Sequence, residues 1–279
     1  MFAIVTTIFW GVWGAFIEIP EKAGFPATLG YSVWALTMLP CALVGLKIIG
    51  WKLEYDPRSI FWGSVVGFLG AGGQLVLFEA LRLGPAYLVF PIISLYPVVT
   101  IFLSVTLLKE RASRQATVGI VLALVAMGLL SYQPPGSSSV RGWLWLLLAV
   151  TVFFCWGIQA YAMKFSNQTM KAESIFFYMM ATAVVLIPVA LYMTDFSKAI
   201  NWGFKGPYLA ALIQVLNSIG ALCLVYAVRY GKAIIVVPMT SLAPVLTIII
   251  SLILYGVIPQ SVLTAGMVVA VIAIYLLAE

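Results

Sequence analysis

Charged side chains are scarce in this chain. Asp, Glu, Lys and Arg together make up 9% of its 279 residues, whereas 63% of the residues are hydrophobic and the mean hydropathy is +1.11. A typical soluble domain contains about 25% charged residues. A chain this apolar cannot cover its surface with polar groups, so the composition excludes an ordinary soluble protein and predicts an integral membrane protein.

Histidine is absent, and only three cysteines occur. The absence of histidine excludes catalytic triads with a histidine base, histidine-ligated metal sites and histidine proton relays. Cys41, Cys155 and Cys223 lie within apolar segments, far apart in sequence, where they are expected to be small apolar core residues. We therefore predict no catalytic residues, no metal site and no cofactor.

Long apolar runs account for most of the chain. Stretches such as GIVLALVAMGLL are apolar on every side, which is typical of a lipid-embedded helix and not of a barrel strand with alternating polarity. Each run is close to the length of about 20 residues that spans a bilayer. The predicted fold class is all-α integral membrane, with ten transmembrane helices. The expected helices are 2–19, 28–50, 60–81, 86–108, 114–131, 142–164, 173–194, 207–228, 233–255 and 261–278.

The basic residues are distributed unequally between the two sides of this ten-helix arrangement. Ten of the 15 fall on one side: Lys47, Lys52, Arg58, Lys109, Arg111, Arg114, Lys164, Lys171, Arg229 and Lys232. The other five are Lys22, Arg82, Arg141, Lys198 and Lys205. Because cytoplasmic loops carry the excess of Lys and Arg, both termini are predicted to be cytoplasmic, in a plasma (bacterial inner) membrane. This bias explains the pI near 9.2 without nucleic acid, and we expect no nucleic-acid partner.

One sequence pattern occurs twice. ALRLGPAYLVFPIISLYPVVTIFLS, from Ala80, and AVRYGKAIIVVPMTSLAPVLTIIIS, from Ala227, are identical at 13 of 25 positions with a constant offset of 147. A similar match, offset by 146, relates WGVWGAFIE at Trp10 to WGIQAYAMK at Trp156. The offset corresponds to five helices, an odd number, so the second copy runs through the membrane in the opposite direction. This predicts two inverted five-helix repeats, 1–133 and 140–279, with a substrate site near the midplane between them.

Prolines recur in the repeated pattern at Pro91 and Pro97, and again at Pro238 and Pro244. A proline inside a helix removes one backbone hydrogen bond and breaks or kinks the helix. The carbonyls that we expect to be freed are those of Tyr87, Ile93, Ile234 and Thr240. Two interpretations stay open for the prolines: a kink that serves packing, or a helix break that serves gating.

Amide and indole side chains are predicted near the membrane midplane, where polar groups are costly. One interpretation is hydrogen bonding between helices, and the other is a cavity for a neutral or zwitterionic solute with an apolar body. The candidate substrate-binding residues are Trp10, Trp13, Gln74, Ser94, Tyr96, Trp156, Gln159, Gln214, Asn217 and Ser241.

Two carboxylates lie within or at the edge of the predicted spans, Glu18 and Glu79. Either is a candidate for proton coupling, because burial raises a carboxyl pKa toward neutrality. Glu79 precedes Arg82 by three residues, so a local ion pair is the favoured interpretation.

The sequence resembles the EamA type of the drug/metabolite transporter superfamily. The resemblance is carried by FWG at Phe9, by EALRLGPAYLVFPIISLYPVV, by LLKERASRQATVGIVLALVAMGLLS and by TAGMVVAVIAIYLLA near the C-terminus. It implies alternating access without ATP. The implied central cavity is lined by helices 2–19, 60–81, 86–108, 142–164, 207–228 and 233–255. Members often have Glu after the long helix of each half, which Glu110 matches and Val257 does not, and Lys is common at the position of Glu18.

The favoured function is a secondary transporter, with export the favoured direction, of small metabolites such as amino acids. A sugar or nucleotide-sugar carrier, or a lipid-linked flippase of the same fold, is the alternative. A membrane-embedded enzyme is disfavoured, because no histidine and no clustered acid pair is present. The expected partners are a small-molecule substrate and the lipid bilayer, with the protein a monomer or a homodimer.

Overall fold

The computed structural model describes residues 1–84, 86–130, 132, 143–255 and 260–277, and within these ranges every regular element is a helix. The first half contains α1 (Phe2–Phe16), α2 (Glu18–Lys22), α3 (Ala27–Ile48), α4 (Pro57–Leu83), α5 (Ala86–Ser94), α6 (Pro97–Thr106) and α7 (Arg114–Leu130). The second half contains α8 (Leu144–Ser166), α9 (Ala172–Val185), α10 (Ile187–Tyr192), η1 (Phe204–Tyr208), α11 (Leu209–Tyr230), α12 (Ala233–Thr240), α13 (Ala243–Tyr255) and α14 (Ser261–Leu277).

Eight helical segments in the described part of the chain are long and apolar enough to cross a membrane. Several of them combine two consecutive helices, as α5 with α6 and α12 with α13 do. Two shorter apolar helices, α7 and α14, occupy the positions of the fifth and tenth predicted spans. The multi-helix membrane architecture is therefore confirmed, while the number of ten crossings and the side of the termini stay predictions.

Both proline-containing repeats contain a broken helix. The first break falls at Leu95 and Tyr96, and Pro97 begins α6; the second falls at Ser241 and Leu242, and Pro244 is the second residue of α13. Pro91 lies within α5 and Pro238 within α12. The expectation of a freed carbonyl at Ile93 was wrong, because this oxygen accepts the N–H of Tyr96 at 3.0 Å as the chain turns out of α5.

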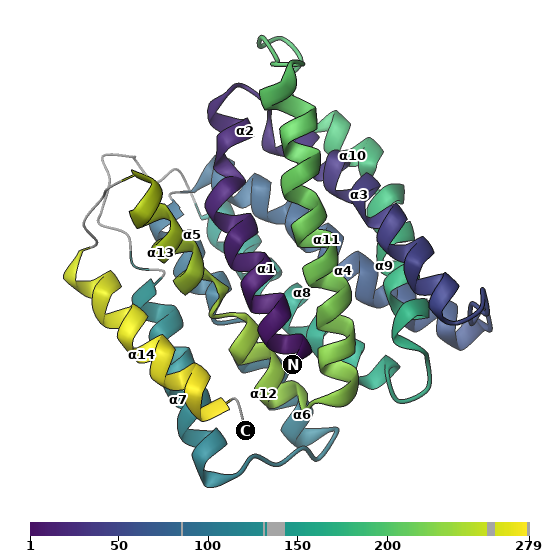
Figure 1. Ribbon diagram of the computed structural model, residues 1–279, viewed down its shortest axis with the longest axis vertical. Helices are drawn as coiled ribbons and strands as arrows, with labels where there is room; N and C mark the ends of the chain where they lie inside the picture. Colours follow the sequence, from purple (N-terminus) through teal and green to yellow (C-terminus); the bar gives the residue numbers. More distant parts are fainter. Residues whose placement is uncertain (85, 131, 133–142, 256–259, 278–279) are drawn as a thin grey trace.

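Equivalent helices of the two repeats make equivalent contacts with the other half. Helix α1 packs against α11 and α13, and its counterpart α8 packs against α4 and α6. The remaining contacts include α3 with α9, on the opposite flank of the bundle from α7 with α14 (Figure 1). Each half therefore places its first helix against the other half, so the interface between the halves lies at the centre of the bundle.

Loops far apart in sequence meet at one end of the bundle, which we call the basic end. Lys232 Nζ donates to the carbonyl of Arg111 at 2.6 Å, and Arg229 Nη1 donates to the carbonyl of Met170 at 2.7 Å. Helix α1 begins and α14 ends toward this same end, the lower one in Figure 1. At the opposite end, Asn201 N–H donates to the carbonyl of Gly24 at 3.1 Å.

Candidate substrate site between the two repeats

A hydrogen-bonded group of predicted site residues joins α1, α3 and α11. Gln214 Oε1 accepts from Trp13 Nε1 at 3.0 Å and from Asn217 Nδ2 at 3.4 Å, while Gln214 Nε2 donates to the carbonyl of Gly30 at 3.3 Å. Only 5% of Gln214 is exposed. The Gln214 amide therefore holds three helices together, which is the interhelical role that the sequence left open.

Two indoles occupy equivalent positions in the two halves. Trp10 Nε1 donates to the carbonyl of Asn217 at 3.3 Å, and Trp156 Nε1 donates to the carbonyl of Gly70 at 3.4 Å. The tryptophans are offset by 146 and their acceptors by 147, as in the repeated sequence. Each indole also covers a glycine of the helix it contacts, Gly220 for Trp10 and Gly73 for Trp156. The repeat therefore preserves contacts as well as residue types.

The second group of predicted residues surrounds the two helix breaks. Ser241 Oγ donates to Tyr96 Oη at 2.8 Å, which links the break in one half to the break in the other. The ring of Tyr96 meets that of Trp156 edge to face, with centroids 6.0 Å apart. The amide of Gln159 lies against Gly70, where any side chain would overlap it.

The other two predicted substrate residues stand on neighbouring elements. Gln74 is half-buried on α4, directly after Gly73, and Ser94 is half-buried at the end of α5. The structure thus brings together Trp10, Trp13, Gln214 and Asn217 in one group and Tyr96, Trp156, Gln159 and Ser241 in another. Because α8 contacts α11 and α12 directly, the two groups belong to one central interface.

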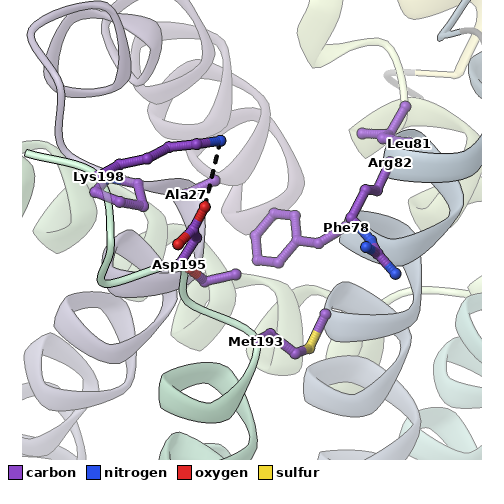
Figure 2. A pocket seen from close by; sticks show the side chains of 9 residues that line it. Ala27, Phe78, Leu81, Arg82, Met193, Asp195 and Lys198 are labelled. Carbon is purple, nitrogen blue, oxygen red and sulfur yellow. Dashed lines mark ion pairs between the residues drawn. The ribbon is translucent and has the colours of Figure 1, made fainter.

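A cavity of about 400 Å³ lies away from these groups, at the end opposite the basic end. Phe78 projects into it from α4 and faces Met193 and Asp195, which follow α10 (Figure 2). None of the predicted substrate residues lines this cavity. The lining residues are Pro26, Ala27, Thr28, Phe78, Leu81, Arg82, Met193, Asp195 and Lys198.

Both candidate coupling carboxylates form local ion pairs. Arg82 Nε donates to Glu79 Oε2 at 2.8 Å, and the Glu79 side chain is 32% exposed. Glu18 pairs with Lys22 one turn later at 2.5 Å, with most of its carboxylate side chain exposed. The expected pairing of Glu79 with Arg82 is therefore confirmed, and each pair stays within its own segment.

A partly buried charged contact at the basic end was missed by the sequence argument. Lys164 Nζ on α8 lies 3.8 Å from Glu110 Oε1 in the loop before α7. A signal for it was present, because the repeat aligns Lys164 with Glu18 and the two differ in sign. Among the described residues, no group of three or more His, Cys, Asp or Glu is placed to hold a metal ion.

The sequence matches the EamA-like transporter family over residues 1–132 and 143–278. The chain belongs to this family. It is therefore a multi-pass integral membrane protein of a transporter family, and the family favours a transporter over a membrane-embedded enzyme. The two matched regions correspond to the two repeats that the sequence pattern indicates.

Two relatives of this EamA-family chain are similar in sequence. Protein LicB of Haemophilus influenzae is 22% identical over 207 residues, which cover 71% of this chain and 69% of LicB. The uncharacterized protein MJ1333.1 of Methanocaldococcus jannaschii is 28% identical over 128 residues, 46% of this chain and 92% of that protein. A solved crystal structure has the same fold, with a TM-score of 0.79 at 16% identity over 99% of this chain and 98% of the other.

Proposed function

We propose that this EamA-family chain is a secondary transporter that exports small neutral or zwitterionic metabolites, such as amino acids, across the plasma membrane. One observation carries the proposal: equivalent hydrogen bonds, such as those of Trp10 and Trp156, connect each half to the other beside the two broken helices. Two inverted halves with matched contacts give the protein two related arrangements, in which access to a central site alternates between the two sides. One chain supplies both halves of this pathway.

The proposed substrate site is the central interface between α1, α4, α8 and α11. Its indoles offer apolar surface. Their N–H groups and the Gln214 amide bond to other helices in this structure, and they are proposed to become available to a solute when those contacts change. Such a lining suits a solute with a small apolar body and both charges of a zwitterion, or none. The helix breaks at Pro97 and Pro244 are proposed to let the halves of each broken helix change angle as the site opens to one side.

Flux into proteoliposomes tests the proposal directly. The purified protein is reconstituted and given a panel of radiolabelled amino acids, with sugars, nucleotide sugars and a fluorescent lipid as competing classes. We expect exchange of at least one amino acid or related metabolite. Movement of a sugar, a nucleotide sugar or a lipid alone would replace the proposal with the corresponding function, and chemical turnover of a substrate would indicate an enzyme.

A matched pair of tryptophan variants tests the location of the site. Trp156→Phe removes the N–H that contacts Gly70, whereas Trp143→Phe changes an indole that is largely exposed at the start of α8. We expect Trp156→Phe to raise the KM for the transported solute several-fold and Trp143→Phe to leave it unchanged. Equal KM values in the two variants would show that the substrate does not bind next to Trp156.

A further inference from the structure

The acidic residues at the two ends of the bundle make different kinds of contact. At the end opposite the basic end, three ion pairs are local: Glu18 with Lys22, Glu79 with Arg82 and Asp195 with Lys198, each three or four residues apart. Such ion pairs stabilise a single segment and do not connect one helix to another. At the basic end, three carboxylates instead contact groups on a different segment, namely Glu54, Glu110 and Glu173.

Glu110 makes the most extensive of these contacts. Its two carboxylate oxygens accept the backbone N–H groups of Ala233 and Ile234, each at 3.1 Å, at the start of α12. The Glu110 side chain is only 9% exposed. Hydrogen bonds to a charged group are stronger than those between neutral groups, so this contact favours the arrangement in which the loop after α6 is closed over α12.

Lys164 completes the same cluster from α8. Its ammonium group donates to the carbonyls of Val228, at 2.9 Å, and Gly231, at 2.5 Å, and lies 3.8 Å from Glu110. The side chain is 18% exposed. Lys164 therefore connects the first helix of the second half to the turn between α11 and α12, which Glu110 reaches from the first half.

Two further contacts close the same end. Tyr226 Oη on α11 donates to Glu173 Oε1 on α9 at 2.5 Å, and the backbone N–H of Lys171 donates to Glu54 Oε2 at 2.6 Å. The first contact joins α11 to α9, and the second joins the loop before α4 to the loop before α9. The polar closure is thus shared by segments from both halves of the chain.

The repeat does not provide this cluster at the other end. In the sequence, the position equivalent to Glu110 is Val257, and the position equivalent to Lys164 is Glu18. A valine accepts no hydrogen bond, and Glu18 carries the wrong sign to act as Lys164 does. Val257 lies outside the residues that the structure describes, so this difference between the two ends is one of sequence.

We propose that Glu110 and Lys164 form the gate at the basic end, and that separation of this pair from the start of α12 is the step that opens that end. The proposal rests on the proposed transport function, because a gate requires a pathway. The structure represents the state with the basic end closed. The contacts of Glu110 and Lys164 bias the resting protein toward this state, whereas the ion pairs described at the opposite end each stay within one segment.

The test measures access to a buried position next to the cluster. Val228 is fully buried, and its carbonyl accepts from Lys164. Val228→Cys is introduced into the full chain after Cys41, Cys155 and Cys223 are replaced with alanine. The protein is placed in nanodiscs, where a membrane-impermeant maleimide reaches both ends. The labelling rate then reports how often the basic end opens, with no need to know the solute.

We expect Glu110→Gln and Lys164→Met each to increase the rate of labelling about tenfold, because each variant loses hydrogen bonds made by a charged group. Asp195→Asn, which removes a local pair at the opposite end, should leave the rate unchanged. Lys164→Arg keeps the charge and should keep labelling slow. The double variant should label no faster than the faster single variant, because the two residues act as a unit.

Unchanged labelling in both Glu110→Gln and Lys164→Met, with melting temperatures near that of the parent, would overturn the gate. If either variant fails to fold, Glu110→Asp, which shortens the reach to α12, replaces it and has to label faster for the proposal to stand. Because labelling does not depend on flux, a protein that labels as expected but moves no amino acid would refute the proposed solute while supporting the gate.

Discussion

Thr247 Oγ1 donates a hydrogen bond to the carbonyl of Gly11 at 2.9 Å, across the contact between α13 and α1. The equivalent hydroxyl in the first half, Thr100 Oγ1, donates to the carbonyl of Gly157 at the same distance of 2.9 Å. Both hydroxyls lie just beyond a helix break, and both acceptors lie one residue after the tryptophan of a Trp-Gly pair. These two bonds attach the second part of each broken helix to the first helix of the other half.

Replacement of either threonine with valine keeps the shape and removes the donor. We expect Thr100→Val and Thr247→Val to lower stability by similar amounts, about 0.6 kcal/mol each, which is typical of side-chain hydrogen bonds between membrane helices. Equilibrium unfolding of the purified protein in mixed micelles measures the difference. A loss at one position only would show that the two contacts are not energetically equivalent.

Gly67 on α4 is a position where no side chain fits. A Cβ added there would lie 2.9 Å from the backbone oxygen of Tyr178 and would overlap the side chain of Thr182. We expect Gly67→Ala to cost about 1–3 kcal/mol, because backbone cannot move aside as easily as a side-chain tip. Gly72→Ala on the same helix is the control, since no atom lies within 4 Å of its added Cβ. The melting temperature should fall for the first variant alone.

Asp56 caps the N-terminus of α4, where its carboxylate accepts the backbone N–H groups of Arg58 and Ser59, and acid should weaken this cap. Hydrogen bonds from the side chain and backbone of Ser59 hold the pKa of Asp56 below its ordinary value. A carboxyl group with a lowered pKa stabilises the fold above its ordinary pKa, and this contribution disappears as the pH falls through the lowered pKa. Asp56→Asn keeps an acceptor that does not titrate. Its melting temperature should therefore fall less than that of the parent between pH 5 and pH 2, as differential scanning fluorimetry would show.

Labelling of introduced cysteines tests the orientation. Gln168 and Ala199 are both exposed and lie at opposite ends of the bundle. Each is replaced singly in a cysteine-free background and labelled in intact cells with an impermeant maleimide. We expect Ala199→Cys to react from outside and Gln168→Cys to react only after lysis, since basic loops stay in the cytoplasm. Reaction of Gln168→Cys in intact cells would reverse the predicted topology.

Glu79→Gln removes a titratable group while it preserves shape. If Glu79 carries the coupling proton, protonation has to break its ion pair with Arg82. We expect the variant to abolish flux driven by a pH gradient and to spare solute exchange without a gradient. Glu18→Gln is measured in parallel. Gradient-driven flux that survives in both variants would indicate an uncoupled facilitator.

Several features followed from local sequence. The scarcity of charged residues predicted a membrane environment. The repeated Pro-Ser-Pro spacing predicted a kink or a break in each repeat, because proline acts on the backbone of its own segment. The ion pair of Glu79 with Arg82 was equally predictable, since residues three apart on a helix are neighbours. The placement of Gln214 was not, because its partners Trp13 and Gly30 are about 200 residues away in sequence.

By itself, the sequence determined a membrane-embedded helical chain in two repeats and predicted that the second repeat runs in the opposite direction, since hydropathy, proline spacing and loop charge are properties of single segments. Only the tertiary structure decided which polar groups meet. Whether a polar side chain such as Gln214 bonds to another helix or stays solvated depends on which helices face each other. The contrast between the local pair of Glu79 and the long-range contacts of Glu110 has the same origin. Glu110 and Lys164 are 54 residues apart, and their contact exists only because both halves pack around the start of α12.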